Sequence, residues 1–215
     1  MVIQKEKTGE HMPNKLFFEL DKQKQDRIIS ASIADFAVHG YENSSTNRIV
    51  KECAISKGSL FKYFENKEDL YFFLIDTVMA EMARDMSNKI SSLSKDLYER
   101  VIEYSTAEIS WYAKNPDKGR FIIGVASEDD PDISKKIIGR YGKKSSDIYH
   151  ELLSEVDLSC IKNDKEKAGD ILQWVLEGFN RAFLENVSTE RDIDELEREY
   201  ISKLKEYLGV LKNGL

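Results

Sequence analysis

The sequence contains few of the residues that interrupt helices or crosslink chains. Its 215 residues include three prolines, eleven glycines and two cysteines. So few prolines and glycines favour long helices and argue against a sandwich of many strands, which needs frequent turns. Cys53 and Cys160 form neither a CxxC pair nor a cluster with histidine. We therefore expect free thiols, no disulfide framework and no metal site.

Long hydrophobic segments are also missing. No apolar run reaches the length of about 18 residues that a membrane-spanning helix needs. The first twenty residues lack the apolar stretch of a signal peptide. Hydrophobic residues still make up 41% of the chain and charged residues 33%, a composition typical of a globular protein with a core of its own. We expect a cytoplasmic protein with no membrane partner.

Recognisable catalytic patterns are absent from the sequence. It contains no HExxH, no GxSxG and no Walker or dinucleotide glycine pattern. The acidic stretch "SEDDPD" at 127–132 lacks the spacing of a calcium loop and is better explained as a capped helix start. Glu103 and Glu108 are interpreted as ordinary helix-surface charge. The chain has three histidines, which are scattered and form no cluster: His11, His39 and His150. We therefore expect neither an enzyme nor a bound cofactor.

The charge of the chain is unevenly distributed. The formal net charge is −7, yet the window 44–67 is basic, with Arg48, Lys51, Lys57, Lys62 and Lys67 against Glu52 and Glu65. A weakly basic patch on an acidic protein is a mild hint of nucleic acid, and taken alone a solvated helix face is the more common explanation of these charges.

Apolar spacing and capping residues predict an all-α fold of about nine helices. The first helix starts after Asp21 and stops at Gly40, and Ser56 caps a short helix over 57–63. A longer helix follows from residue 65 or 66. Later helix starts are predicted at Ser94, Pro116 and Asp130-Pro131. We expect three parts: a tail or helix extension over 1–20, a DNA-binding domain over 21–67 and a larger helical domain over 68–215.

Two short helices with a tight turn between them, over about 45–63, predict a helix-turn-helix, whose second helix enters the DNA major groove. The groove-facing turn needs small or cationic side chains, which Lys57, Gly58 and Ser59 provide. Lys62 and Tyr63 are expected to point outward toward phosphates. Lys67 opposes the dipole of the helix that it begins, so we expect a partner such as a phosphate to hold it.

The stretch "GYENSSTNRIVKECAISKGSLFKYFENKEDL", residues 40–70, resembles the DNA-binding signature of TetR/AcrR-type transcriptional regulators. The resemblance implies a three-helix DNA-binding domain, a body with an effector pocket and a homodimer formed by the last two helices. Carried onto this chain, it implies these DNA-binding residues: Ser45, Thr46, Asn47, Lys57, Gly58, Ser59, Lys62, Tyr63 and Lys67. Beyond residue 75 the resemblance is architectural only.

Two positions depart from the family pattern. Ala54 stands at the turn position where the family usually has glycine. If that position needs a positive φ, alanine there destabilises the fold by about 1 kcal/mol. Phe61 stands where the family often has a phosphate-bonding tyrosine, and we interpret it as a core residue rather than a DNA contact.

Aromatic and methionine side chains of the body are candidates for an effector pocket, although at helical spacing such residues more often form core. The candidates are Met82, Met86, Tyr104, Trp111, Phe121, Trp174 and Phe179. They imply a small-molecule effector that is largely apolar or aromatic. A second set recurs along the last two helices and is expected at a dimer interface: Val175, Phe183, Leu196, Tyr200, Leu204 and Tyr207.

The sequence thus predicts a homodimeric regulator that binds double-stranded operator DNA and is released by an effector. An activator of the same family remains open. So does a helical enzyme or scaffold with an accidental helix-turn-helix, which would lack salt-dependent DNA binding.

Overall fold

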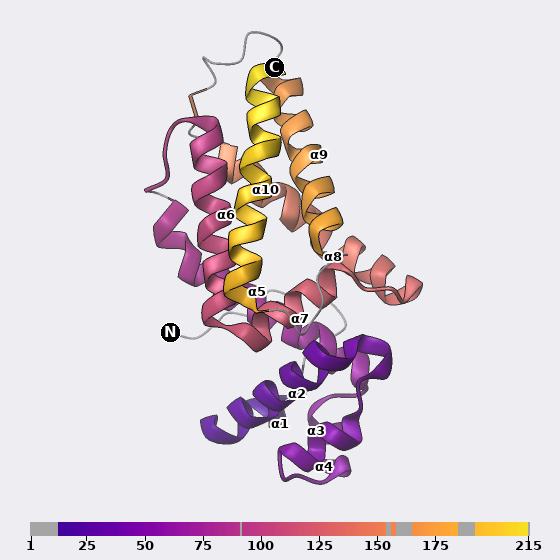
Figure 1. The fold of residues 1–215 in the computed structure, drawn as a ribbon. Helices are drawn as coiled ribbons and strands as arrows, with labels where there is room; N and C mark the ends of the chain where they lie inside the picture. Colours follow the sequence, from indigo (N-terminus) through magenta and orange to yellow (C-terminus); the bar gives the residue numbers. More distant parts are fainter. Residues whose placement is uncertain (1–12, 91, 154–155, 158–164, 185–191, 215) are drawn as a thin grey trace. The chain divides into compact units, whose positions relative to one another are not determined.

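Ten α-helices and no strand make up the described part of the chain in this computed structural model. The structure describes residues 13–90, 92–153, 156–157, 165–184 and 192–214. The helices are α1 (Lys15–Phe18), α2 (Lys22–Asn43), α3 (Thr46–Glu52), α4 (Lys57–Tyr63), α5 (Lys67–Ile90), α6 (Leu97–Lys114), α7 (Pro116–Ala126), α8 (Pro131–Leu153), α9 (Lys165–Leu184) and α10 (Ile193–Gly214), as labelled in Figure 1.

The all-α expectation is confirmed, and the additional helix is α1, a single turn within the segment expected as a tail or helix extension. The chain divides into two compact units, Met1–Ala80 and Glu81–Leu215, and the division falls inside α5. No helix in the described ranges combines the length and the apolar content needed to cross a membrane.

Aromatic packing holds α1 in the first unit. Phe17 is fully buried, and its ring centroid lies 5.1 Å from that of Phe64 and 5.3 Å from that of Phe73. The N–H of Asn14 donates to the carbonyl of Tyr63 at 2.8 Å. These contacts attach the start of the described chain to the end of α4 and to α5.

Short polar side chains start helices where the sequence predicts, with one exception. Asp21 and Asp130 each accept a backbone N–H with a side-chain oxygen, and Pro116 opens α7. The predicted cap at Ser94 is wrong. The side chain of Asp96 caps α6 instead and accepts two backbone N–H groups at 3.0 and 2.9 Å, because α6 begins two residues later than the pattern suggested.

Gly40 has a φ of +66°, the left-handed conformation that favours glycine. The sequence predicted that the helix would stop there. Instead α2 kinks at Gly40 and continues for one further turn to Asn43. The carbonyls of that turn are used by side chains of the candidate interface.

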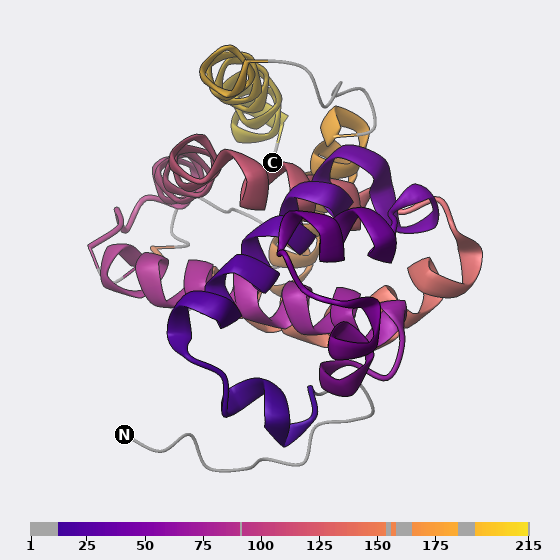
Figure 2. The ribbon, with the colours of Figure 1, turned by 90° about the horizontal axis from the view of Figure 1, so that it is seen from below.

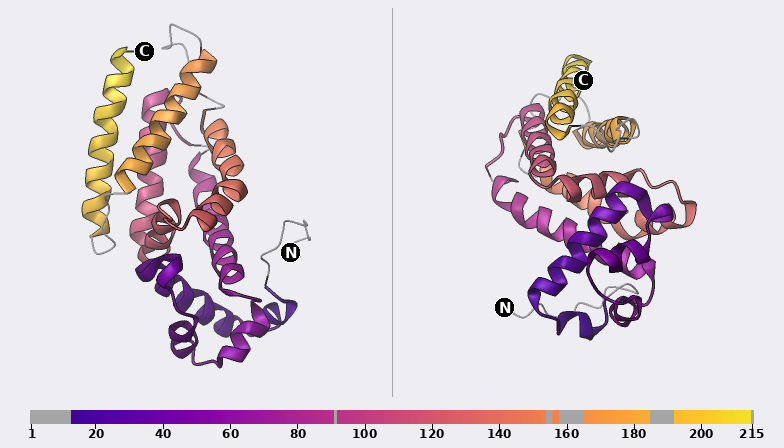
Figure 3. Two further views of the ribbon diagram at one scale, coloured as in Figure 1. Left: turned by 90° about the vertical axis from the view of Figure 1, so that its right-hand side faces the viewer. Right: turned by 60° about the horizontal axis from the view of Figure 1, so that its bottom comes forward.

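In the second unit, α6 packs against α7, α8 and α10. The buried guanidinium of Arg100 donates from Nε to the carbonyl of Leu152 at 2.6 Å, which ties α6 to the end of α8. Helices α9 and α10 lie side by side (Figures 1 and 3), and the ring of Phe179 lies 5.1 Å from that of Tyr200.

Candidate nucleic-acid interface

A tight turn joins α3 to α4 (Figure 2). The N–H of Ile55 donates to the carbonyl of Val50 at 3.0 Å, and the N–H of Ala54 donates to that of Lys51 at 3.2 Å. This pair of bonds is a Schellman motif, whose first residue after the helix cap is left-handed. Ala54 is that residue and has a φ of +53°. The turn therefore has the positive φ that makes alanine costly.

We expect Ala54→Gly to raise the free energy of unfolding by about 1 kcal/mol, because glycine adopts a left-handed conformation without a Cβ clash. Urea denaturation followed by circular dichroism measures the change. The matched control is Ala80→Gly, an exposed position inside α5, which should lose about 1 kcal/mol. If Ala54→Gly loses as much as the control, the turn carries no strain.

The exposed face of α4 carries Lys57, Gly58, Phe61 and Lys62. The outward orientation expected for Tyr63 is wrong: the residue is only 8% exposed, and its ring lies 6.2 Å from that of Phe17. The core position expected for Phe61 is also wrong, since it is 40% exposed.

Both errors have one cause. α4 packs on α1 as well as on α3, and the contact with α1 turns Tyr63 inward. Phe61 consequently lies on the same exposed face as Lys57, whose ammonium is 6.0 Å from the centre of its ring. The sequence did not indicate this exposed apolar ring between two lysines, because an aromatic residue in a helix usually predicts a core position.

Ser56 fixes the first turn of α4. Its hydroxyl accepts the N–H of Ser59 at 3.0 Å and forms a 2.8 Å hydrogen bond with the hydroxyl of Ser59. The predicted cap is therefore confirmed. It also means that the hydroxyl of Ser59, a predicted DNA contact, already has a partner within the protein.

At the start of α3, Asn47 is exposed and Thr46 is partly exposed. Ser45 occupies the N-cap position, but its side chain makes no capping hydrogen bond. Its backbone N–H instead donates to Oδ2 of Asp35 at 2.8 Å. The Ser45 hydroxyl is therefore not used to cap α3.

Arg48 contributes less to the basic patch than its charge suggests. Its Nε donates to Oδ1 of the buried Asp35 carboxylate at 2.6 Å, and one terminal nitrogen donates to the carbonyl of Asn43 at 2.8 Å. A partly buried, charge-assisted pair of this kind fixes α3 against α2. The positive charge that is available to a partner comes chiefly from the exposed lysines of α4, Lys57 and Lys62.

Lys67 has the partner that its unfavourable position required, but that partner lies within the chain and is not a phosphate. Its ammonium donates to the carbonyls of Tyr41 at 2.7 Å and Glu42 at 3.1 Å, and it lies 4.4 Å from the centre of the Tyr41 ring. Those carbonyls belong to the turn of α2 that follows Gly40. The unfavourable position of a cation at a helix start is thus offset within the chain, and a phosphate contact for Lys67 stays a prediction.

We expect Lys67→Met to lower the free energy of unfolding by about 1.5–3 kcal/mol, the usual range for hydrogen bonds to a charged group. Chemical denaturation measures the loss. Lys62→Met is the matched control, because Lys62 is exposed and should change stability little. Unchanged stability of Lys67→Met, together with a weaker salt dependence of DNA binding, would identify Lys67 as a phosphate contact alone.

The α3–α4 surface presents ammonium groups, an exposed amide and, in the first turn of α4, small side chains. Ammonium groups bind phosphates, and an amide such as that of Asn47 forms bidentate bonds to adenine. A short helix held by a fixed turn fits the width of the major groove. The chemistry of this surface is recognition of double-stranded DNA.

The candidate pocket residues of the second unit do not share one environment. Met86, Trp111 and Phe121 are buried, and Nε1 of Trp111 donates to Asp85 at 3.0 Å. Met82, Tyr104 and Phe179 are partly exposed, whereas Trp174 is 66% exposed. Trp174 therefore faces away from the interior in which a pocket was expected.

The candidate dimer residues divide in the same way. Three of them, Leu196, Tyr200 and Leu204, are already buried by the chain itself, since α10 packs along α6. Phe183 is buried and Val175 is partly exposed. Tyr207 is mostly exposed. The seam predicted on α10 therefore belongs mainly to the core of the second unit.

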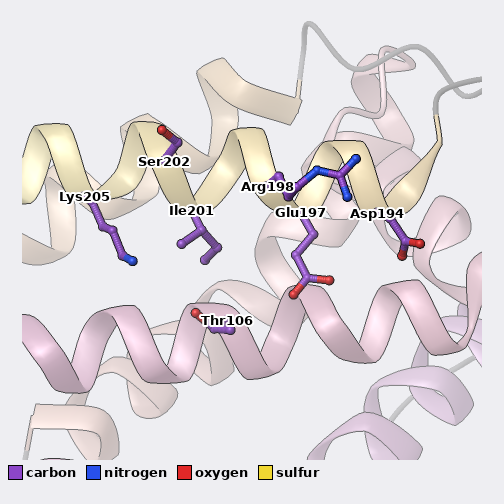
Figure 4. A pocket seen from close by; sticks show the side chains of 7 residues that line it. All are labelled: Thr106, Asp194, Glu197, Arg198, Ile201, Ser202 and Lys205. Carbon is purple, nitrogen blue, oxygen red and sulfur yellow. The ribbon is translucent and has the colours of Figure 1, made fainter.

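An open groove of about 580 Å³ lies between α10 and α6 (Figure 4). No residue of the groove was among the predicted pocket residues. Its mixed charges, two acidic and two basic, favour no single class of ligand. The lining residues are Thr106, Asp194, Glu197, Arg198, Ile201, Ser202 and Lys205.

Comparison with known proteins supports the same reading. Residues 28–72 match the family described as "Bacterial regulatory proteins, tetR family". The chain is 24% identical over 181 residues to the HTH-type transcriptional repressor AcnR of Corynebacterium diphtheriae, covering 84% of this chain and 88% of that protein.

Two solved structures share the fold. A TetR family transcriptional regulator from Chloroflexus aurantiacus is 22% identical, with a TM-score of 0.63, covering 94% of this chain and 98% of that one. The transcriptional regulator FadR of Bacillus subtilis in complex with stearoyl-CoA is 18% identical, with a TM-score of 0.60, covering 83% and 96%.

The fold and the α3–α4 surface define a helix-turn-helix protein that binds DNA. Residues 28–72 match the DNA-binding region of the TetR family, and the chain as a whole is similar to transcriptional regulators of that family.

Proposed function

We propose that this protein is a transcriptional repressor that binds a pseudo-palindromic operator as a homodimer and leaves it when a small molecule binds the second unit. The exposed face of α4, with two lysines beside Gly58 and Phe61, is the observation that carries the proposal. The similarity to a named repressor favours repression over activation. Such a regulator acts in the cytoplasm, where its operator lies.

A dimer is needed because one short helix contacts only one half-site. Two recognition helices must lie about 34–36 Å apart, or a multiple of that distance, to enter successive major grooves on one side of the DNA. An effector that binds one dimer geometry more tightly than the other shifts the population away from the DNA-binding geometry.

The dimer surface that we propose is formed by exposed apolar side chains of α9 and α10. It comprises Trp174, Tyr207 and Val210, which are 66%, 56% and 73% exposed. Helices α9 and α10 pack against each other, and the ring of Tyr207 lies 5.6 Å from that of Phe179. Several large apolar side chains exposed on a helix pair are typical of a surface that a partner covers. We name it the α9–α10 patch.

The base-reading role of Asn47 and Lys57 gives the test of this function. We expect selection from a random DNA library to yield a palindromic motif for the wild type. Asn47→Ala and Lys57→Ala should each relax the preference at particular positions, with about 1–3 kcal/mol of discrimination lost per bidentate contact. The reason is that the truncated side chain no longer meets a base edge.

The matched control is Lys203→Ala on α10, which removes the same charge from the second unit and should keep the wild-type motif. Binding of the wild type should also weaken steeply with salt. A wild type that selects no motif, or binds DNA without salt dependence, would contradict a DNA-binding regulator. Identical motifs for all variants would remove the base-reading role alone.

A further inference from the structure

Phe61 places an aromatic ring on the exposed face of α4, outside the core of the first unit. It is 40% exposed, and it follows Lys57 by four positions and Gly58 by three. These spacings place the three residues side by side on one face of the helix. The core side of the helix is already occupied by buried residues: Leu60, Tyr63 and Phe64. The Phe61 ring therefore lies on the surface that faces DNA in the proposed function.

Gly58 leaves the helix surface beside this ring bare. Apart from its chain neighbours and the backbone of α4, a Cβ added at Gly58 would meet only Oγ of Ser56, at an ordinary contact distance of 3.9 Å. The fold thus has room for a side chain here, although glycine weakens a helix relative to alanine. A bare backbone next to an exposed ring is explained by a partner that approaches α4 closely.

Two cations border the ring. The ammonium of Lys57 lies 6.0 Å from the centre of the Phe61 ring, and the adjacent Lys62 is exposed. Ammonium groups bind phosphates, whereas a phenyl ring has no hydrogen bond to offer them and needs an apolar partner. In the major groove, the apolar group at a base edge is the C5 methyl of thymine.

We propose that Phe61 reads pyrimidine C5 methyl groups in the major groove, and that Gly58 lets α4 approach closely enough for this contact. The ring packs on one thymine methyl in each half-site, while Lys57 and Lys62 bond to polar groups of the DNA. The inference rests on the proposed function, because the methyl group belongs to the operator. Since 5-methylcytosine carries the same methyl group at the same place, operator binding should also respond to cytosine methylation.

Deoxyuridine tests the contact without any change to the protein, because it pairs as thymine does and lacks only the C5 methyl. The selected operator is synthesised with deoxyuridine at one thymine position of both half-sites at a time. Fluorescence anisotropy measures the affinity of the full chain for each operator. At one position we expect affinity to fall about 15-fold, since each half-site loses the burial of one methyl group, worth about fourfold.

Variants at residue 61 assign the effect to the ring. Phe61→Ala should bind the thymine and deoxyuridine operators equally, whereas Phe61→Tyr keeps the ring and should keep the preference for thymine. Both variants should show wild-type circular dichroism, because the side chain is exposed. Phe18→Ala is the matched control. It removes the same ring from a 52% exposed position on α1 and should keep the wild-type preference.

Cytosine and 5-methylcytosine give a second comparison at the same position, because they also differ only by the C5 methyl. In an operator that carries a G·C pair there in both half-sites, methylation should raise wild-type affinity by the same factor of about 15. Phe61→Ala should not distinguish the two operators. Equal wild-type affinity for both would contradict recognition of the methyl group.

Gly58→Ala tests the close approach. The added methyl group should lower operator affinity at least about tenfold by overfilling the contact with DNA. The thermal midpoint of unfolding should stay equal or rise, because alanine is the better helix former. Gly124→Ala on α7, where an added Cβ also has room, is the matched control and should keep wild-type affinity. Wild-type affinity of Gly58→Ala would contradict the close approach.

A selected operator in which no thymine responds to deoxyuridine would overturn the inference. A response that persists in Phe61→Ala, or that disappears in Phe18→Ala as well, would overturn the assignment to Phe61. Each of these results leaves operator selection and its salt dependence unchanged and so contradicts this inference alone. A wild type that selects no motif would contradict the proposed function itself, and this inference with it.

Discussion

Leu204→Glu is expected to unfold the second unit rather than release a folded monomer. Leu204 is 1% exposed, and Tyr200 and Leu208 on the same face of α10 are also buried. Losing a buried leucine costs about 1.5–3 kcal/mol, and an uncompensated charge adds a desolvation penalty. The sum is a large fraction of the about 5–15 kcal/mol by which such domains are stable.

Circular dichroism and urea denaturation measure this outcome. Leu204→Met, which conserves volume and polarity, is the matched control and should cost less than about 1.5 kcal/mol. A Leu204→Glu protein with native helix content and a cooperative transition, found as a monomer by sedimentation velocity, would show that this side chain faces a second copy of the chain.

Trp174→Glu is expected to give the complementary result, a folded chain that no longer dimerises. Trp174 belongs to the α9–α10 patch and is mostly exposed, so a charge there costs the isolated chain little. In the proposed interface the same charge loses its water and has no partner. Operator affinity should fall by about 10²–10⁴-fold, because the two DNA-binding units are no longer linked.

Sedimentation velocity and fluorescence anisotropy with the selected operator measure the two effects. Ile138→Glu is the matched control, because Ile138 on α8 is equally exposed at 67% and lies outside the α9–α10 patch. It should stay dimeric and keep its operator affinity. A dimeric Trp174→Glu protein with wild-type affinity would place the interface on another surface.

Local chemistry alone determined most helix boundaries and the turn at the candidate interface. The predicted range 57–63 matches α4, and the caps at Asp21 and Ser56 form as expected. Each of these features depends on residues within four or five positions, which the sequence places next to each other. The strained turn at Ala54 was predictable for the same reason. Its cost follows from alanine standing at a turn position that needs a positive φ.

Tertiary contacts decided which side of each helix is covered and which charges are already paired. A periodic pattern shows that a helix has an apolar face, but not whether the same chain or a second copy covers it. Leu204 is therefore core, whereas Trp174 is exposed. The ammonium of Lys67 and the carboxyl of Glu108 have partners 26 and 4 residues away. Only folding shows that the first holds the end of α2 and that the second accepts the hydroxyl of Tyr112.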